Sequence, residues 1–402
     1  LMRRTAMAAV PRLGDWCTVH FAPQPGVHEI EVAHSDPDRM EWARSMRDRY
    51  PIDPNAAFGV PAVLRSGRTE FFAGVDRYLE DPSVAELHAP VPEDLQIIVE
   101  ALGMTSIITV PLLTKRGVIG AMQFVSAESR RRYDDDDVAL AEAAAGRIGA
   151  ALDNAWHSEQ QREIAATLQA ALLPTHLPEI PGIGVAVRYW AAGAVSEVGG
   201  DFYDVFAIDE HRWAVVIGDV CGTGAGAAAI TSTARHTIRA AATHGASPAE
   251  VLEWVNAAVL RDGDGRFCTV VYTELTAIGN GSWRAATVVG GHPLPVIVDA
   301  SCNVESLGAH GTLIGALDHI RLTPTEQVLG PGTTIVMHTD GVNDVPAPHG
   351  LDDAALASLI TGSIAAHSSA DEIANRVGDA VAAILPIPER DDDIAIVVLR
   401  IS

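Results

Sequence analysis

Val198-Gly-Gly-Asp-Phe-Tyr-Asp204 and Trp213-Ala-Val-Val-Ile-Gly-Asp219 are the stretches that decide the fold of the second half of the chain. In the first, Asp201 follows two glycines and precedes an aromatic strand. In the second, Asp219 ends an apolar strand and opens a glycine-rich segment. An ionised carboxylate at the edge of an apolar strand is costly unless something compensates its charge. Few basic residues lie near either aspartate in the sequence, so the compensation has to come from elsewhere.

Two more acidic positions repeat this design. Asp340 ends the run Thr334-Ile-Val-Met-His-Thr339 and is followed by glycine. Asp391, Asp392 and Asp393 lead directly into the apolar run 394–399 and provide the fourth position. Hard divalent cations bind carboxylate and water oxygens. We therefore predict a Mg²⁺ or Mn²⁺ site made by the carboxylates at these four positions. The alternative is that they are ordinary turn residues, because Asp and Gly are common in turns, but four such positions together favour the metal site.

Other catalytic sites have no support in the sequence. The fifteen histidines show neither His-x-x-Glu-His nor His-Glu-x-x-His spacing, and there is no Gly-x-Ser-x-Gly elbow or Walker motif. Gly222-Thr-Gly-Ala-Gly226 resembles a dinucleotide-binding loop only superficially, because no acidic residue follows at the expected distance of roughly 20 residues. Cys221 adjoins the predicted site but has no evident base partner, so we expect an inert thiol.

The composition excludes several classes of partner. The 402 residues carry 28 basic and 52 acidic side chains, a net charge of −24, and no basic block is present to bind nucleic acid or an anionic membrane. No apolar run approaches the ~18 residues of a membrane span, and the short apolar stretch that ends at Pro11 does not make a signal peptide. The four cysteines are widely separated, which fits a reducing cytoplasm better than a disulfide framework.

Periodicity and turn residues predict an α+β chain of two or three domains. In the first part we expect strands at 27–33, 106–113 and 118–125 and a helix at 92–103. From residue 183 on we expect strands at 183–190, 202–208, 212–219, 268–275, 283–289, 294–298, 333–338 and 394–401, with helices at 224–244, 247–261, 352–366 and 370–384.

The two parts are joined by one long helix or two shorter ones over residues 138–173, which follow the acidic run Asp134–Asp137. Apolar residues recur there every three to four positions. Such a helix either packs on its own domain or pairs two chains as a parallel coiled coil. Both interpretations are open from the sequence.

Five motifs, in one order, identify a family. They are 198–204, Gly218-Asp-Val-Cys-Gly-Thr-Gly224, Gly290-Gly-His-Pro-Leu-Pro295, Thr339-Asp-Gly341 and Asp392-Asp393. Together they resemble the SpoIIE/RsbU branch of the metal-dependent PPM (type 2C) serine/threonine phosphatases, with Ile164–Pro174 similar to that branch's lead-in. Residues 63–68, 106–111 and 117–120 resemble a GAF sensor domain. The resemblance implies a GAF-like domain at 1–155 (a central antiparallel sheet with helices), a helical linker at 156–175 and a PPM αββα sandwich at 176–402.

The resemblance also implies a role for each predicted ligand. Asp201 would bridge two Mn²⁺ or Mg²⁺ ions, Asp219 and the Val220 carbonyl would hold one of them, and Asp340 and Asp392 would complete the other. In the family these ions activate a water that attacks the phosphorus of a phosphoserine or phosphothreonine. All four carboxylates are present, so we expect a competent enzyme.

Two departures from the family pattern concern the substrate's phosphate. Thr223 stands where a basic or imidazole side chain is common. The phosphate-binding arginine of eukaryotic relatives has no clear counterpart. Arg188 is a candidate substitute, with a surface or structural role as the alternative.

The implied partners follow from the same branch. The expected substrate is a phosphorylated anti-sigma-factor antagonist, a small STAS-domain protein. A small-molecule ligand at the GAF-like domain and a homodimer formed through the connecting helix are further expectations. A catalytically weak sensory scaffold that binds a partner through a phosphatase-like fold is the alternative, and a hydrolase of small phosphoesters is a third.

Overall fold

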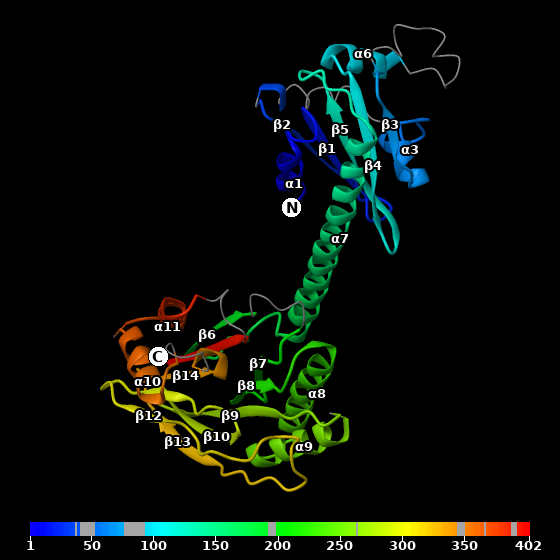
Figure 1. Ribbon diagram of the computed structural model, residues 1–402. Coiled ribbons are helices and arrows are strands. Elements are labelled where there is room, and N and C mark those ends of the chain that lie inside the picture. Colours follow the sequence, from blue (N-terminus) through cyan, green and yellow to red (C-terminus); the bar gives the residue numbers. More distant parts are fainter. Residues whose placement is uncertain are drawn as a thin grey trace. The chain divides into compact units, whose positions relative to one another are not determined.

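The structure is a computed structural model, and it describes residues 1–36, 38–40, 53–75, 93–191, 198–262, 264–343, 350–365, 367–386 and 392–402. The chain divides into two compact units, Leu1–Glu159 and Gln160–Ser402. One long helix, α7 (Asp135–Leu172), contributes residues to both. Figure 1 labels the elements of each unit. Among the described residues, no helix has the length and apolar character needed to cross a bilayer.

The first unit is built on one antiparallel sheet of order β2-β1-β5-β4-β3. Its strands are β1 (Trp16–Phe21), β2 (Glu29–His34), β3 (Glu70–Phe72), β4 (Ser106–Thr114) and β5 (Gly117–Ser126), and its other helices include α1 (Met2–Ala9), α3 (Val60–Ser66) and α6 (Glu93–Leu102). Cys17 and Val19 of β1 pack against Ala141 and Ala145 of α7 and against α1 in one buried cluster. This arrangement confirms the expected central sheet with helices.

The second unit contains two five-stranded sheets, of orders β13-β10-β9-β8-β7 and β12-β11-β14-β15-β6. The first is made of β7 (Phe202–Ala207), β8 (Arg212–Val220), β9 (Cys268–Gly279), β10 (Ser282–Gly290) and β13 (Thr325–Leu329). The second is made of β6 (Ile183–Trp190), β11 (Val296–Val298), β12 (Val304–Ser306), β14 (Thr334–His338) and β15 (Ile394–Ile401). Residues such as Ile217 and Val271 of the first sheet meet Met337 and Val397 of the second in a shared core.

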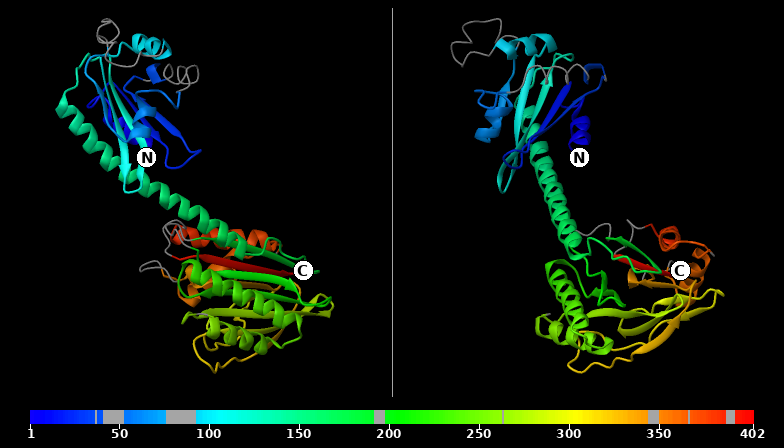
Figure 2. Two further views of the ribbon diagram at one scale, coloured as in Figure 1. Left: turned by 90° about the vertical axis from the view of Figure 1, so that its right-hand side faces the viewer. Right: turned by 180° about the vertical axis from the view of Figure 1, so that it is seen from behind.

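Two pairs of helices cover the outer faces of these sheets (Figure 2). The helices α8 (Gly224–Thr243) and α9 (Pro248–Asp262) pack on the first sheet, where Ile230 and Val255 share a buried cluster with Val216. The helices α10 (Asp353–Ser363) and α11 (Ala370–Ile384) pack on the second sheet. The layers therefore run helix, sheet, sheet, helix, which confirms the expected αββα sandwich.

The central strands of the second sheet are mostly apolar because helices or the other sheet cover both of their faces. Every residue of β14 is buried, and so are seven of the eight residues of β15. The polar residues at the ends of these strands are consequently brought to the edges of the paired sheets. The predicted aspartates lie at those ends.

Candidate metal centre

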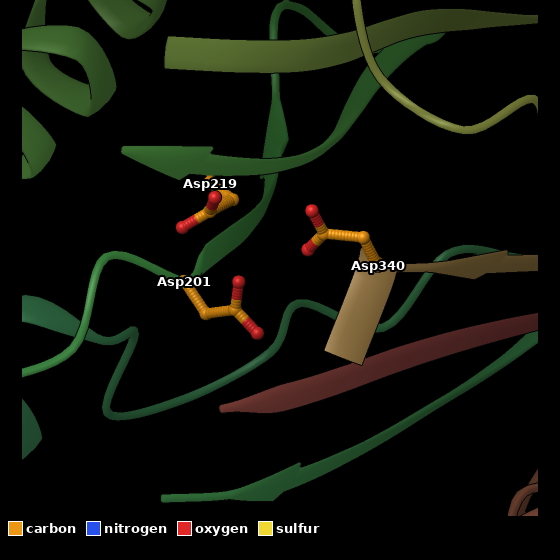
Figure 3. A group of neighbouring side chains, drawn as sticks. All are labelled: Asp201, Asp219 and Asp340. Atoms are coloured by element: carbon orange, nitrogen blue, oxygen red, sulfur yellow. The ribbon is translucent and has the colours of Figure 1, made fainter. Parts of the chain in front are cut away.

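Three of the four predicted aspartates meet in the second unit. Each of Asp201, Asp219 and Asp340 offers a carboxylate oxygen, and these oxygens all lie within 4.8 Å of one another. Figure 3 shows the three carboxylates around a common space. Asp201 immediately precedes β7, Asp219 lies in β8, and Asp340 opens a short 3-10 helix (Asp340–Val342) directly after β14. The cluster therefore joins the ends of strands from both sheets.

Glycines next to the aspartates make this approach possible. A Cβ on Gly200 would lie 2.1 Å from the Val220 carbonyl oxygen and 2.5 Å from Asp219 Oδ1. A Cβ on Gly341 would lie 1.9 Å from the Asp393 carbonyl oxygen. Neither position has room for a side chain. The Val220 carbonyl, which the sequence predicts as a ligand, thus lies beside the residue that precedes Asp201.

The orientation of Asp201 is fixed by a hydrogen bond. Thr339 Oγ1 donates to Asp201 Oδ2 at 2.7 Å, and the Ala395 amide donates to the same hydroxyl at 2.9 Å. Asp201 and Thr339 are both buried. Thr339, at the end of a strand of the second sheet, therefore orients the carboxylate of Asp201, which precedes a strand of the first sheet.

Burial and nearby negative charge raise the pKa values of Asp201 and Asp219. Burial, followed by the charge of Asp219, raises the pKa of Asp201 well above its ordinary value. Burial, followed by the charges of Asp340, Asp392 and Asp393, raises the pKa of Asp219 to about 7. Carboxylates in such an environment gain from a nearby cation. The donors are all oxygens, and they fit Mg²⁺ or Mn²⁺.

Asp392, the fourth predicted ligand, lies outside this group of three. It is exposed, and its Oδ1 accepts a hydrogen bond from the Asp393 amide at 2.9 Å. Its charge still raises the pKa of both Asp201 and Asp219, so it belongs to the same electrostatic environment. Asp391, the first member of the acidic triplet, lies outside the described residues.

Asp393 is a buried residue of this region to which the sequence assigned no role. Its Oδ2 accepts hydrogen bonds from Tyr189 Oη at 2.6 Å and from Gln169 Nε2 at 2.8 Å. Gln169 lies near the end of α7, and a Cβ on Gly199 would collide with the Asp393 carboxylate at 1.5 Å. Only its place in the acidic triplet pointed to this residue.

The contacts of Arg188 fit the surface or structural role that the sequence left open for it. Arg188 Nη2 donates to Asp371 Oδ1 at 2.6 Å and its Nε donates to Asn375 at 2.8 Å, so it ties β6 to α11. Arg266 Nη1 donates at 2.8 Å to the carbonyl oxygen of Cys221, two residues beyond Asp219. A Cβ on Gly222 would lie 2.4 Å from that guanidinium. The glycine-rich segment therefore accommodates an arginine, which no local sequence signal indicated.

Comparison with known proteins finds two families. The sequence model described as Stage II sporulation protein E (SpoIIE) matches residues 209–402, and the model described as GAF domain matches residues 1–152. Phosphoserine phosphatase RsbP of Bacillus subtilis is 30% identical over 159 residues, which are 38% of this chain and 39% of RsbP. Phosphoserine phosphatase RsbU of the same organism is 27% identical over 245 residues, which are 59% of this chain and 69% of RsbU.

Among solved structures, the RsbU and RsbW domains of a Mycobacterium tuberculosis protein align with a TM-score of 0.48 at 24% identity, over 57% of this chain and 63% of that one. The chain thus spans less than half the length of RsbP and about two thirds of the length of RsbU.

Proposed function

We propose that this chain, which carries a GAF domain followed by a SpoIIE-type PPM phosphatase domain, is a metal-dependent protein serine/threonine phosphatase. The observation that carries the proposal is the convergence of Asp201, Asp219 and Asp340 at the ends of strands from both sheets. The family matches support it, because the two Bacillus relatives bear the name phosphoserine phosphatase.

We assign the metal ligands to Asp201, Asp219, Asp340 and Asp392 with the Val220 carbonyl, as holders of two Mn²⁺ or Mg²⁺ ions. Divalent cations bound there would supply Lewis acidity, lowering the pKa of water and neutralising phosphoryl oxygens. The protein's own contribution is to hold the carboxylates in place. Thr339 orients Asp201, and the glycines at 200 and 341 let the strand ends approach.

The finer assignments belong to the same proposal. We place the GAF-like sensor at 1–155, the helical linker at 156–175 and the phosphatase at 176–402. The substrate would be a phosphorylated STAS-type anti-sigma-factor antagonist, and the sensor domain, with a small-molecule ligand, would regulate its dephosphorylation. We further propose a cytoplasmic homodimer. The free cysteines are consistent with a reducing compartment.

The test is phosphatase activity of the full chain with Mn²⁺ on a phosphoserine protein and on p-nitrophenyl phosphate. We expect hydrolysis of both, with a preference for the protein, and a loss of at least about 100-fold in Asp219→Asn and Asp340→Asn. Asp379→Asn is the matched control, because Asp379 is an exposed aspartate of α11 in the same unit.

Absence of hydrolysis in excess Mn²⁺ would favour the sensory scaffold instead. A preference for the small ester would favour a hydrolase of small phosphoesters.

A further inference from the structure

His292 is a buried histidine that the proposed function does not use. It belongs to the Gly290-Gly-His-Pro segment that follows β10, and only 1% of its surface is exposed. The backbone of Gly291 has a φ of +72°, and a Cβ there would lie 2.4 Å from Leu313 Cδ2. The turn at Gly291 therefore directs the backbone so that the imidazole of the next residue, His292, is buried.

Both ring nitrogens of His292 are hydrogen-bonded. Nδ1 lies 2.7 Å from Thr269 Oγ1, and Nε2 lies 3.0 Å from the His338 carbonyl oxygen. A carbonyl can only accept, so Nε2 carries the proton and Nδ1 accepts from the threonine hydroxyl. The ring is neutral, since burial and then His338 lower the pKa of His292 to about 3. Both partners are thus satisfied by a single tautomer.

These two partners belong to different sheets. Thr269 lies on β9, directly opposite Asp219 of β8 in the strand register. His338 is the last residue of β14, and only Thr339 separates it from Asp340. The imidazole therefore connects the register partner of Asp219 in the first sheet to the residue two positions before Asp340 in the second sheet.

An ordinary core hydrogen bond in the same sheet provides the comparison. Thr273 on β9 and Thr287 on β10 are buried, and their hydroxyls lie 2.9 Å apart. Both residues belong to the first sheet. This bond contributes to folding, but it does not join the two sheets. It is therefore the matched control for the bond between Thr269 and His292.

We propose that His292 is a positioning residue of the metal centre, whose imidazole links Thr269 to the His338 carbonyl and thereby sets the separation of Asp219 and Asp340. The inference rests on the proposed metal-dependent function. Residues that orient metal ligands through hydrogen bonds change metal affinity by about 10- to 100-fold when they are replaced. The link should therefore affect binding of Mn²⁺ more strongly than it affects folding.

The experiment measures the Kd for Mn²⁺ by titration calorimetry and the free energy of unfolding in EDTA, both on the full chain. Thr269→Val removes the hydroxyl, and Thr273→Val removes the control hydroxyl. We expect both variants to lose similar stability, but only Thr269→Val to weaken Mn²⁺ binding, by about 10-fold or more. Thr269→Ser keeps the hydroxyl and should restore the wild-type Kd.

Replacing the imidazole gives a second measurement. His292→Gln keeps an amide donor near the Nε2 position and should weaken Mn²⁺ binding as Thr269→Val does. The variant that carries both substitutions should bind Mn²⁺ little more weakly than either single variant, because all three variants break the same hydrogen-bonded link between Thr269 and the His338 carbonyl. In saturating Mn²⁺, kcat should recover.

The inference is overturned if wild type binds Mn²⁺ and Thr269→Val binds it equally well, since His292 would then be a core residue only. A wild-type protein that binds no Mn²⁺ overturns the proposed function itself, and this inference with it.

Discussion

The glycines at 199, 200 and 341 lie where a Cβ would collide with a carboxylate or a backbone carbonyl of the acidic region. At Gly200 two groups oppose a side chain at once, since a Cβ there would lie 2.1 Å from the Val220 carbonyl oxygen and 2.5 Å from Asp219 Oδ1. Small residues at these positions are a geometric requirement of the site. They also explain why an aspartate flanked by glycine was informative in the sequence although the same pair is common in turns.

Gly200→Ala should disrupt the cluster. The added methyl group has to displace either the Val220 carbonyl or the Asp219 carboxylate, so we expect a loss of about 1–3 kcal/mol in stability and loss of phosphatase activity. Gly362→Ala is the matched control, because a Cβ there meets nothing within 4 Å in helix α10 and should be neutral or slightly stabilising. Chemical denaturation and initial rates measure both effects. Full activity of Gly200→Ala would contradict the site geometry.

The raised pKa of Asp219 predicts how stability depends on pH without metal. A carboxyl group with a pKa near 4 when unfolded and about 7 when folded binds more protons in the folded state, so its contribution to stability falls as pH rises between those values. His292 has a lowered pKa and acts in the opposite sense below pH ~6.5. Comparing wild type with Asp219→Asn separates the two contributions, because the substitution removes only that of Asp219. In EDTA, the stability advantage of Asp219→Asn over wild type should increase from pH 4 to pH 7.

Sequence reasoning found the site residues whose immediate neighbours in the sequence form a recognisable pattern. Asp201, Asp219 and Asp340 stood at strand ends beside glycine. Thr339 and His292 lie within two of the five motifs, but their hydrogen-bond partners are 138 and 46 residues away, so the sequence did not indicate their contacts. Sequence reasoning also treated Asp392 and Asp393 as one run, whereas in the structure the first is exposed and the second is buried and hydrogen-bonded.

At the level of elements, burial alone does not decide which strands are predicted, since β1 was missed although five of its six residues are buried. β15 agrees with the expectation at both ends, because its apolar run is buried along nearly its whole length. β6 also agrees at both ends, although it is an edge strand with only two of its eight residues buried. The edge strands β12 and β13 were missed. All three residues of β12 are exposed, and Val328 of β13 is 64% exposed, so neither strand leaves an apolar pattern. Their place is determined by pairing with β11 and β10.

The connecting helix is one continuous element, α7, and its N-terminal half packs on the first unit. Its C-terminal end belongs to the second unit, where Gln169 donates to Asp393. Packing on its own domain, one of the two interpretations of the pattern, is therefore observed for the first half. Pairing of two chains through the exposed Ile164 and Leu168 stays a prediction.

Gln169→Ala should loosen the end of α7. The variant removes the hydrogen bonds from the amide to Asp393 and to Tyr189, while Tyr189 still donates to Asp393. A hydrogen bond to a charged group is worth about 1.5–3 kcal/mol, so we expect faster amide hydrogen exchange over residues 165–172. Gln161→Ala, at an exposed position of the same helix, is the control and should leave that exchange unchanged.

At the level of the whole molecule, each unit has a core of its own. The core of the first unit combines β1, β4 and β5 with α1 and α7, and the cores of the second unit lie between its sheets and beneath its two helical pairs. Units with separate cores can unfold in separate transitions. The predicted metal ligands all belong to the second unit, so a bound cation stabilises that unit alone.

Calorimetry of the full chain should therefore show that Mn²⁺ raises one unfolding transition and leaves the other in place. A ligand that binds only the folded state at one hundred times its Kd stabilises by about 2.7 kcal/mol per site, and the shift should grow with the logarithm of its concentration. EDTA should reverse it. In Asp219→Asn the metal-dependent shift should disappear, whereas the metal-independent transition should remain where it is in wild type. A Mn²⁺-dependent shift of equal size in that variant would place the cation away from the three converging aspartates.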